Sequence, residues 1–217
     1  MKPNPFLPRF EDLPAELPLF PISGAVVMPG VQLPLNIFEP RYLSMVDYAL
    51  ATQHLIGMVQ PRLTEQNGDL IYQVGCGGRI TSYTETHDGR IVLVLTGFCR
   101  FEVIQELQTP QDFRRAQVSW QRFSSDYNAP SALADREQLL SSLRSYCTRH
   151  HVEVPWDDIA KMVDSELVNL LCTHLPLDVD DKQALVETVD LSERATLMCG
   201  LMDMSALAGN ATTQLRH

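Results

Sequence analysis

The chain has 217 residues, of which 45% are hydrophobic, and its 27 acidic and 17 basic residues give a formal net charge of −10. A chain of this length buries about 70% of its unfolded surface, so it forms one large domain or two small ones without disulfides. The negative charge disfavours nucleic acid and anionic membranes as partners, because phosphate binding needs clustered Lys or Arg and the densest basic pair is Arg114–Arg115.

The cysteines and the amino terminus indicate a reduced, cytoplasmic protein. The cysteines are odd in number and widely spaced without a CxxC pair: Cys76, Cys99, Cys147, Cys172 and Cys199. The first 16 residues carry prolines and acids where a secretory signal needs an apolar core, and they read as an irregular arm. No run approaches the roughly eighteen apolar residues of a membrane span.

The first structured stretch predicts three strand-like apolar runs. Residues 17–20 form a short run, and residues 25–28 form a β-branched run that ends at the Pro29–Gly30 turn. Residues 31–37 repeat the pattern but include Pro34. Because proline has no backbone N–H, we expect this third strand at a sheet edge or a bulge.

A helix follows directly. Glu39 occupies the cap position, Pro40 suits the first helical position, and apolar residues recur at helical spacing at Leu43, Val46 and Leu50. Beyond this helix, further strands are predicted over residues 54–60, 70–74, 79–83, 91–96, 98–104 and 113–120. Seven or eight short strands at this spacing favour a small closed barrel or a pair of curved sheets.

An apolar run and a group of glycines lead to specific expectations for these strands. The unbroken apolar run 91–95 predicts a strand covered on both faces, and Gly97 permits a corner after it. The glycines around Cys76, at positions 75, 77 and 78, lack the spacing of a phosphate-binding loop and precede no helix. They are expected to let a barrel strand bend or bulge.

The composition changes near residue 123, after which apolar residues recur at helical spacing. Ser131 is expected to cap a helix that runs toward His150 and His151, with a turn over residues 156–162. Asp164 is expected to cap the next helix. Two more helices are predicted over residues 179–188 and 191–207, because Asp178 and Asp190 have the spacing of helix caps. Residues 1–123 and 124–217 are therefore predicted as two subdomains.

Several blocks of the sequence carry a family resemblance. The stretch LPLFPISGAVVMPGVQLPLNIFEPRYLSMV resembles the start of the Lon protease amino-terminal domain. The resemblance continues through LIGMV, YQVG and TGFCRF, and it reaches LPLDVDDKQALVETVDLSERATLMCGLM near the end of the chain. It implies an α+β fold with a PUA-like small β-barrel, made of curved antiparallel sheets with one inserted helix, followed by a carboxy-terminal helical bundle. It also implies a stand-alone relative that binds polypeptide.

The catalytic parts of an ATP-dependent protease are not expected in this chain. A Walker motif needs a lysine after a glycine, whereas Lys2, Lys161 and Lys182 follow Met1, Ala160 and Asp181 respectively. In the resembled family, the serine and lysine of the peptidase lie in a separate carboxy-terminal domain, and the sequence ends before such a domain would begin. We therefore expect no catalytic residues and no cofactor.

Metal binding is not expected either. His150 and His151 are near Glu153, but adjacent histidines on a helix point about 100° apart and the HExxH spacing is absent. Basic side chains at the carboxyl end of a helix complement the helix dipole, and this is the role expected for the two histidines.

The resemblance places candidate peptide-binding residues at the start of the first helix. Glu39, Arg41 and Ser44 match a charged cluster of the Lon domain, and Phe38 and Tyr42 are the aromatic candidates beside them. A helix start held by local ion pairs is the alternative role of these residues. In the last helix, Met198 and Met202, with Met204, form a thioether-rich surface that is either core packing or an adaptable peptide-binding patch.

Three functions remain open at this point. The first is a non-catalytic module that binds unfolded or hydrophobic polypeptide in an apolar groove, on the barrel or at its junction with the helices. The second is an enzyme with a pocket between barrel and bundle that uses Cys76, His87 or Asp88. The third is a nucleotide or RNA reader, which would need a basic face. The sequence does not identify the partner or the oligomeric state.

Overall fold

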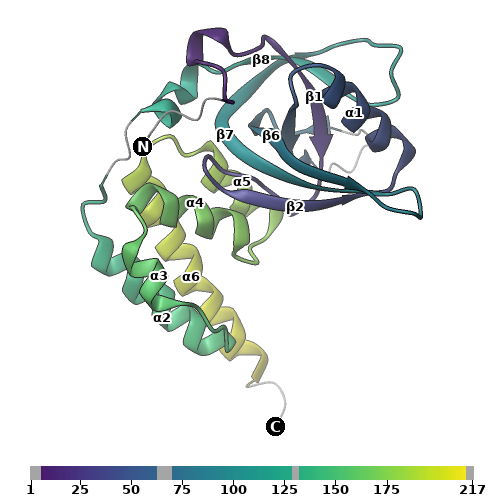
Figure 1. Ribbon diagram of the computed structural model, residues 1–217. Helices are drawn as coiled ribbons and strands as arrows, with labels where there is room; N and C mark the ends of the chain where they lie inside the picture. The colour runs from purple at the N-terminus through teal and green to yellow at the C-terminus, as the bar shows by residue number, and fades with distance from the viewer. Residues whose placement is uncertain (1–5, 63–69, 129–131, 214–217) are drawn as a thin grey trace.

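The computed structural model describes residues 6–62, 70–128 and 132–213, with side chains up to residue 204. A curled sheet and a group of helices lie beside each other (Figure 1), which confirms the α+β fold class. The amino-terminal arm includes one short turn of 3-10 helix, η1 (Phe10–Asp12). Among the described helices, none combines the length and the apolar character that crossing a membrane requires.

Six strands build the main sheet in the order β2-β7-β6-β3-β1-β8, and β7 also pairs with β8. The five strands β7-β6-β3-β1-β8 therefore form a closed ring. Strand β2 is not part of this ring and pairs with the first half of β7. The strands are β1 (Glu16–Pro21), β2 (Gln32–Ile37), β3 (Leu55–Val59), β6 (Val74–Glu85), β7 (Ile91–Glu106) and β8 (Arg115–Ser119). The short strands β4 (Pro61–Arg62) and β5 (Leu70–Ile71) pair with each other.

One pairing differs from the expected antiparallel sheets. Strand β1 runs parallel to β3, with Leu19 opposite Gly57 and Pro21 opposite Val59. The chain reaches β3 through β2 and the helix α1 (Pro40–Ala51), and such a crossover returns the chain in the same direction. The sheet is therefore mixed, and α1 is the inserted helix that the resemblance implied.

The glycines around Cys76 lie inside one long strand, whereas two separate strands were predicted. Strand β6 runs through them, and its register against β7 shifts between Gly77 and Gly78, which confirms the expected bulge. A Cβ atom on Gly75 would lie 2.3 Å from the carbonyl oxygen of Met58, and one on Gly77 would meet the Phe98 ring at 2.7 Å. Glycine is needed here because the barrel interior is filled by aromatic rings.

Strand β7 also differs from its prediction. It continues through Gly97 as one strand, with a register shift opposite the bulge of β6, where two strands with a corner were expected. Ile91, Leu93 and Leu95 are buried, whereas Val92 between them is 44% exposed. The expectation that both faces are covered is wrong, because this half of the strand has one face in the core and the other in solvent.

Residues 25–28 are not a strand, although Val26, Val27 and Met28 are buried as their apolar character predicts. The run ends in a tight turn in which the Val31 N–H donates to the Met28 carbonyl at 3.0 Å, and Gly30 supplies the positive φ of +81°. Strand β2 follows at the sheet edge with Pro34 inside it, which confirms the predicted edge position.

Five helices form the second half of the described chain: α2 (Arg136–His150), α3 (Trp156–Lys161), α4 (Asp164–His174), α5 (Val179–Glu187) and α6 (Leu191–Thr213). A 3-10 segment, η2 (Gln121–Tyr127), links β8 to them. Helix α3 occupies the stretch that was predicted as a turn. Asp190 caps α6, because its carboxylate accepts the N–H groups of Ser192 and Glu193, both at 2.9 Å, as predicted.

The other predicted caps do not hold as expected. Asp178 occupies the cap position of α5, but its side chain makes no capping hydrogen bond. Helix α2 is capped by Asp135, which accepts the Gln138 N–H at 2.9 Å, and Ser131 lies outside the described residues. Asp164 is the first residue of α4 and not its cap; its carboxylate accepts the Leu133 N–H at 2.7 Å and pairs with Arg136. The carboxylate of Asp164 therefore binds the segment before α2 and the first residue of α2, and not the start of its own helix.

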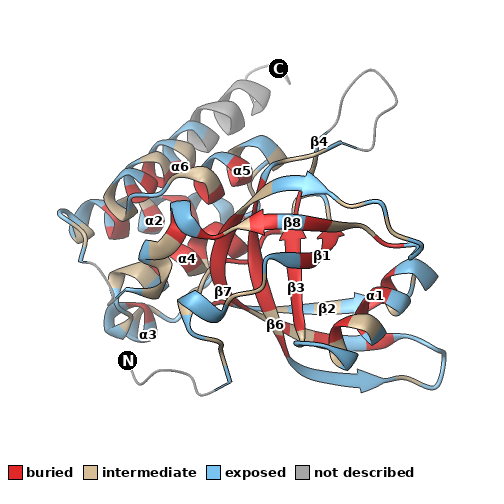
Figure 2. Cartoon of the chain, turned by 90° about the horizontal axis from the view of Figure 1, so that it is seen from above, coloured by how far each residue is buried: buried red, intermediate tan, exposed pale blue. Residues whose placement is uncertain are grey.

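The buried residues form two clusters. Figure 2 shows buried positions along the strands of the barrel and in the helices beside it. The larger cluster is continuous from the barrel interior, at Phe101 and Trp120, to the helices, at Leu167 and Met198. The smaller cluster lies under α1 and includes Val46. Because the larger cluster contains side chains from both halves of the chain, the barrel and the helices share one core.

Candidate functional site

A hollow of about 350 Å³ opens at the start of helix α1. Its lining comes from the end of β1 and the residues after it (20–23), from the end of β2 (36–38), and from the first turn of α1 (39, 41 and 42). Its volume is at the small end of the range for ligand pockets, roughly 300–1,000 Å³. We call this hollow the α1 groove.

Prolines shape the α1 groove. Strand β1 ends at Pro21, so the chain leaves the sheet there. Pro40 occupies the first turn of α1, where its missing N–H costs no hydrogen bond. The Glu39 carbonyl accepts the N–H groups of Tyr42 at 2.9 Å and Leu43 at 3.0 Å. The helix therefore starts abruptly after β2, and residues 38 and 39 lie at the mouth of the groove.

The inner part of the groove is aromatic and apolar. The rings of Phe20 and Tyr42 meet edge to face, with their centres 4.6 Å apart, and both residues are buried. Ile37 is buried beside them. Phe38 is 62% exposed, and the Arg90 guanidinium lies 6.0 Å from the centre of its ring. An apolar side chain entering the groove would meet rings on more than one side.

Two opposite charges stand at the rim and neutralise each other. Arg41 donates from Nε and Nη2 to Oε2 of Glu39, at 3.1 and 2.9 Å, and both side chains are about half exposed. The Arg41 guanidinium also lies 4.6 Å from the centre of the Tyr42 ring. Glu39 does occupy the helix cap position, but its carboxylate does not cap the helix. The local ion pair expected as the alternative role of these residues is therefore present.

The structure brings together four of the predicted peptide-binding residues: Phe38, Glu39, Arg41 and Tyr42 all line the α1 groove. Ser44 is exposed but does not line it, and its hydroxyl donates to the Pro40 carbonyl at 3.1 Å within the helix. No sequence pattern pointed to Phe20 or Asn36, which join the groove only because β1 and β2 end beside α1.

The other predicted pair is not at the surface. Met198 and Met202 of α6 have no exposed area, so the expectation that they offer a peptide-binding patch is wrong. Helix α6 packs along α2, and both thioethers are enclosed in the larger core cluster. Met204 is 66% exposed. Core packing is the role that the structure gives Met198 and Met202.

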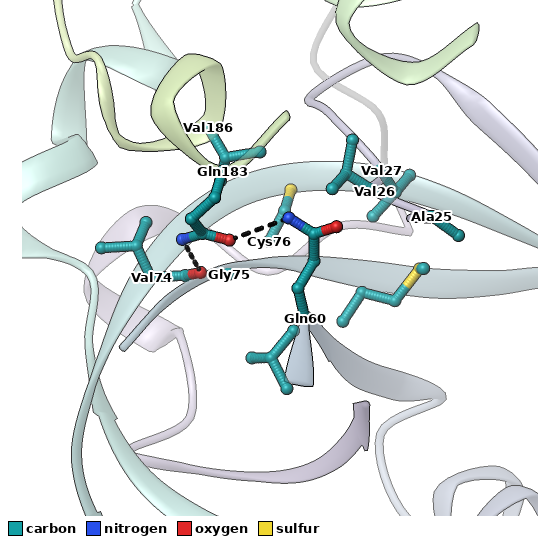
Figure 3. Close-up of a pocket in the computed structure, with 11 residues that line it drawn as sticks. Ala25, Val26, Val27, Gln60, Val74, Gly75, Cys76, Gln183 and Val186 are labelled. Atoms are coloured by element: carbon teal, nitrogen blue, oxygen red, sulfur yellow. Dashed lines mark hydrogen bonds between the residues drawn. The ribbon is translucent and has the colours of Figure 1, made fainter. Parts of the chain in front are cut away.

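The junction between the barrel and the helices is filled (Figure 3). Its hollow measures about 10 Å³, enough for about one water molecule. Gln60 of the barrel donates from Nε2 to Oε1 of Gln183 at 3.2 Å, and Gln183 donates from Nε2 to the Val74 carbonyl at 3.0 Å. The junction therefore offers no open groove at this place, and the candidate site is on the barrel.

The residues proposed for an enzyme are not brought together. Cys76 is buried, and burial raises the pKa of its thiol well above its ordinary value. His87 and Asp88 follow the far end of β6 in an exposed hairpin. From Cys76 to the end of that strand at Glu85 the backbone covers about 30 Å, at roughly 3.3 Å per residue. No base or acid of this trio lies within reach of the thiol.

The histidines near residue 150 have structural positions. The His150 ring lies 4.3 Å from that of Tyr146, and His151 ends helix α2 with a positive φ of 53°. Among residues 6–62, 70–128 and 132–204, no group of three or more His, Cys, Asp or Glu side chains is placed to hold a metal ion.

Comparison with known proteins gives a consistent result. Residues 16–204 match the model of the ATP-dependent protease La (LON) substrate-binding domain. The sequence is 28% identical to the Lon protease of Cytophaga hutchinsonii over 203 residues, which is 89% of this chain and 24% of that protein. It is also 28% identical to the Lon protease of Anaeromyxobacter dehalogenans, over 92% of this chain and 24% of that protein. The chain thus spans about a quarter of these relatives.

Solved structures have the same fold. A Lon N-terminal domain protein from Xanthomonas campestris superposes with a TM-score of 0.62 and 22% identity, covering 85% of this chain and 97% of that one. The N-terminal domain of the Mycobacterium avium complex Lon protease gives a TM-score of 0.62 at 19% identity, with 87% and 98% covered. All residues that line the α1 groove lie inside the matched range 16–204.

Proposed function

Because the chain belongs to the ATP-dependent protease La (LON) substrate-binding domain family, we propose that its α1 groove binds unfolded or hydrophobic polypeptide segments without cutting them. The observation that carries the proposal is the exposed ring of Phe38 at the mouth of an apolar hollow. Single exposed apolar side chains are common on proteins, but Phe38 adjoins a hollow that Phe20, Ile37 and Tyr42 also line. Contiguous apolar surface of this kind marks sites that a partner covers.

The groove has the composition expected of a peptide site. Its inner part offers the rings of Phe20 and Tyr42, which supply contact area at a low cost in side-chain entropy. Burial of apolar surface contributes about 25 cal/mol per Å², and association costs several kcal/mol before any net affinity results. Because of these costs, we expect micromolar and not nanomolar affinity for a short peptide.

The absence of cutting rests on two supports. The matched family model describes the substrate-binding domain, and the relatives match this chain over about a quarter of their length. Within the described residues, the candidate nucleophile Cys76 is buried in the barrel, remote from His87 and Asp88. The proteolysis named for the longer relatives is therefore not assigned to this chain.

Peptide binding can be tested by fluorescence anisotropy with labelled, unstructured peptides that differ in aromatic and aliphatic content. We expect micromolar binding of the apolar peptides and at least a ten-fold weaker affinity for the Phe38→Ser variant. Ile104→Ser is the matched control, because Ile104 is 60% exposed on β7 and does not line the groove. Equal affinities of the two variants, or no binding by the wild type below millimolar concentration, would contradict the proposal.

A further inference from the structure

Within the part of the chain that the structure describes, strand β2 has one unpaired edge. It begins the strand order of the main sheet and pairs with β7 alone, from Gln32 opposite Thr96 to Ile37 opposite Ile91. The residues at the end of this strand, from Asn36 to Phe38, line the α1 groove. The end of the unpaired edge therefore lies at the groove.

The register shows which backbone groups face outward. In an antiparallel pair, alternate residues direct their N–H and C=O groups to the partner strand and the others direct theirs away. The Gly97 N–H donates to the Val31 carbonyl at 2.9 Å, and the register continues from there without a shift. Leu33, Leu35 and Ile37 therefore bond to β7, whereas Gln32, Pro34 and Asn36 face away from it.

Two independent features agree with this assignment of the residues that bond to β7 and those that face away from it. The Thr86 N–H donates to the Arg90 carbonyl at 2.9 Å on the β6 side of β7, so the next residue, Ile91, faces β2. Pro34, which has no N–H, occupies an outward position and so removes no bond from the ladder. Pro34 also disfavours pairing along the first half of the edge, because it has no N–H to donate to an added strand. The backbone of Asn36 has both an N–H donor and a C=O acceptor.

From this arrangement we infer that the polypeptide held in the α1 groove is an extended segment that pairs its backbone with Asn36 as an added strand beside β2. This inference rests on the proposed function and specifies how the segment binds. Addition of a strand to an exposed sheet edge supplies affinity through main-chain hydrogen bonds, and pockets for alternate side chains supply selectivity. One side chain of the segment points into the apolar hollow lined by Phe20, Ile37 and Tyr42.

The chemistry of the occupant follows from the groove. Its rim charges, Glu39 and Arg41, bond to each other, so the rim presents no net charge to the segment. The inner wall is aromatic and apolar. The favoured occupant is therefore an uncharged stretch with an aliphatic or aromatic side chain, and without proline at the residue that meets Asn36. Main-chain pairing makes the site tolerant of sequence, as recognition of unfolded segments requires.

The test removes one backbone N–H, and a control variant accounts for the loss of the Asn36 side chain. In Asn36→Pro the outward donor is lost while the bonds of Leu35 and Ile37 to β7 remain, because position 36 matches the position that Pro34 already occupies two residues earlier. Asn36→Ala is the matched control, since it removes the side chain and keeps the N–H. We expect the affinity for an apolar peptide to fall about five-fold in Asn36→Pro and to stay within two-fold in Asn36→Ala.

A second arm changes the peptide. Methylation of single backbone nitrogens along the bound peptide should weaken binding at alternate positions, because only alternate N–H groups of an added strand face β2. Thermal unfolding of Asn36→Pro, followed by circular dichroism, verifies that it folds. Should it be unfolded, the methylated peptides with the wild type decide the question, because binding that is unaffected at every position would overturn strand pairing.

The outcomes separate this inference from the proposed function. If the wild type binds peptides and neither Asn36→Pro nor methylation has an effect, the groove binds polypeptide by side chains alone and strand addition is wrong. If the wild type binds no peptide, the proposed function itself fails. Sedimentation would reveal a different occupant. A dimer of the wild type that becomes a monomer in Asn36→Pro would assign the edge to a second copy of the chain and overturn the inference.

Discussion

Arg100 and Asp126 form a two-bonded ion pair inside the protein, with side chains 1% and 8% exposed. Arg100 donates from Nη2 to Oδ1 at 2.8 Å and from Nε to Oδ2 at 3.0 Å. Its remaining nitrogen, Nη1, donates to the carbonyls of Val186 and Thr188 at the end of α5, at 3.1 and 2.6 Å. A residue of the TGFCRF block thus joins the barrel to the helices.

Removal of the acidic partner should be strongly destabilising. In Asp126→Ala the Arg100 guanidinium would stay buried without its carboxylate, and breaking a buried pair in this way costs about 3–5 kcal/mol. Urea unfolding, followed by circular dichroism, measures the loss. Glu102→Gln is the control, because the Arg122–Glu102 pair is more than a third exposed and should change the free energy of unfolding by less than about 1 kcal/mol. Similar losses in the two variants would contradict the assigned role.

Two glycine-to-alanine substitutions should have opposite effects. On Gly75 the added Cβ would lie 2.3 Å from the Met58 carbonyl oxygen, so the backbone of β6 or β3 has to shift; we expect a loss of about 2 kcal/mol or more. On Gly200 of α6 nothing lies within 4 Å, and alanine is favoured over glycine in a helix by about 1 kcal/mol. Thermal melting should show a lower Tm for Gly75→Ala and a higher Tm for Gly200→Ala.

The five cysteines should be unreactive in the folded protein. All are buried, and burial raises the thiol pKa in each case, to about 12 for Cys172. The thiolate is the reactive form, so little of it exists at pH 8. We expect a disulfide reagent such as DTNB to label no thiol within minutes under native conditions and all five in denaturant. Rapid native labelling at Cys76 would reopen the enzyme hypothesis.

Acid should weaken the contact between α4 and the segment before α2. Burial disfavours the charge of Asp164, but the Leu133 N–H and Arg136 bind its carboxylate and outweigh that effect, so its pKa lies below the ordinary 3.8. A lowered folded-state pKa means that the contribution is complete above about pH 4 and is lost as pH falls through the folded value.

The Asp164→Asn variant tests this pH dependence. It should lose about 1–3 kcal/mol of stability at pH 7, and its difference from the wild type should shrink below pH 3. Urea midpoints measured from pH 2.5 to 7 check both expectations. Asp158→Asn, which alters an exposed pair with Lys161 at 3.9 Å, is the control. If the stability difference between Asp164→Asn and the wild type does not change with pH, the charge of the Asp164 carboxylate is not the source of the stabilisation.

Local chemistry was sufficient for much of the fold. Pro34 placed β2 at an edge, Pro40 marked the start of α1, and the glycines around Cys76 predicted the bulge in β6. Each of these follows from backbone geometry that the residue itself imposes. The errors have a different origin. Residues 25–28 have the apolar character of a strand, but the sequence reports only that they are buried, and burial does not require pairing.

The sequence by itself determined the fold class, the family resemblance and the residues at the start of α1, because turns, caps and apolar periodicity act over a few neighbouring residues. Only the tertiary structure decided that Phe20 and Asn36 complete the groove with Phe38, that the methionines of α6 lie inside, and that Arg100 reaches Asp126. These contacts join residues far apart in the chain. Their existence depends on how strands and helices pack in three dimensions, which local patterns do not encode.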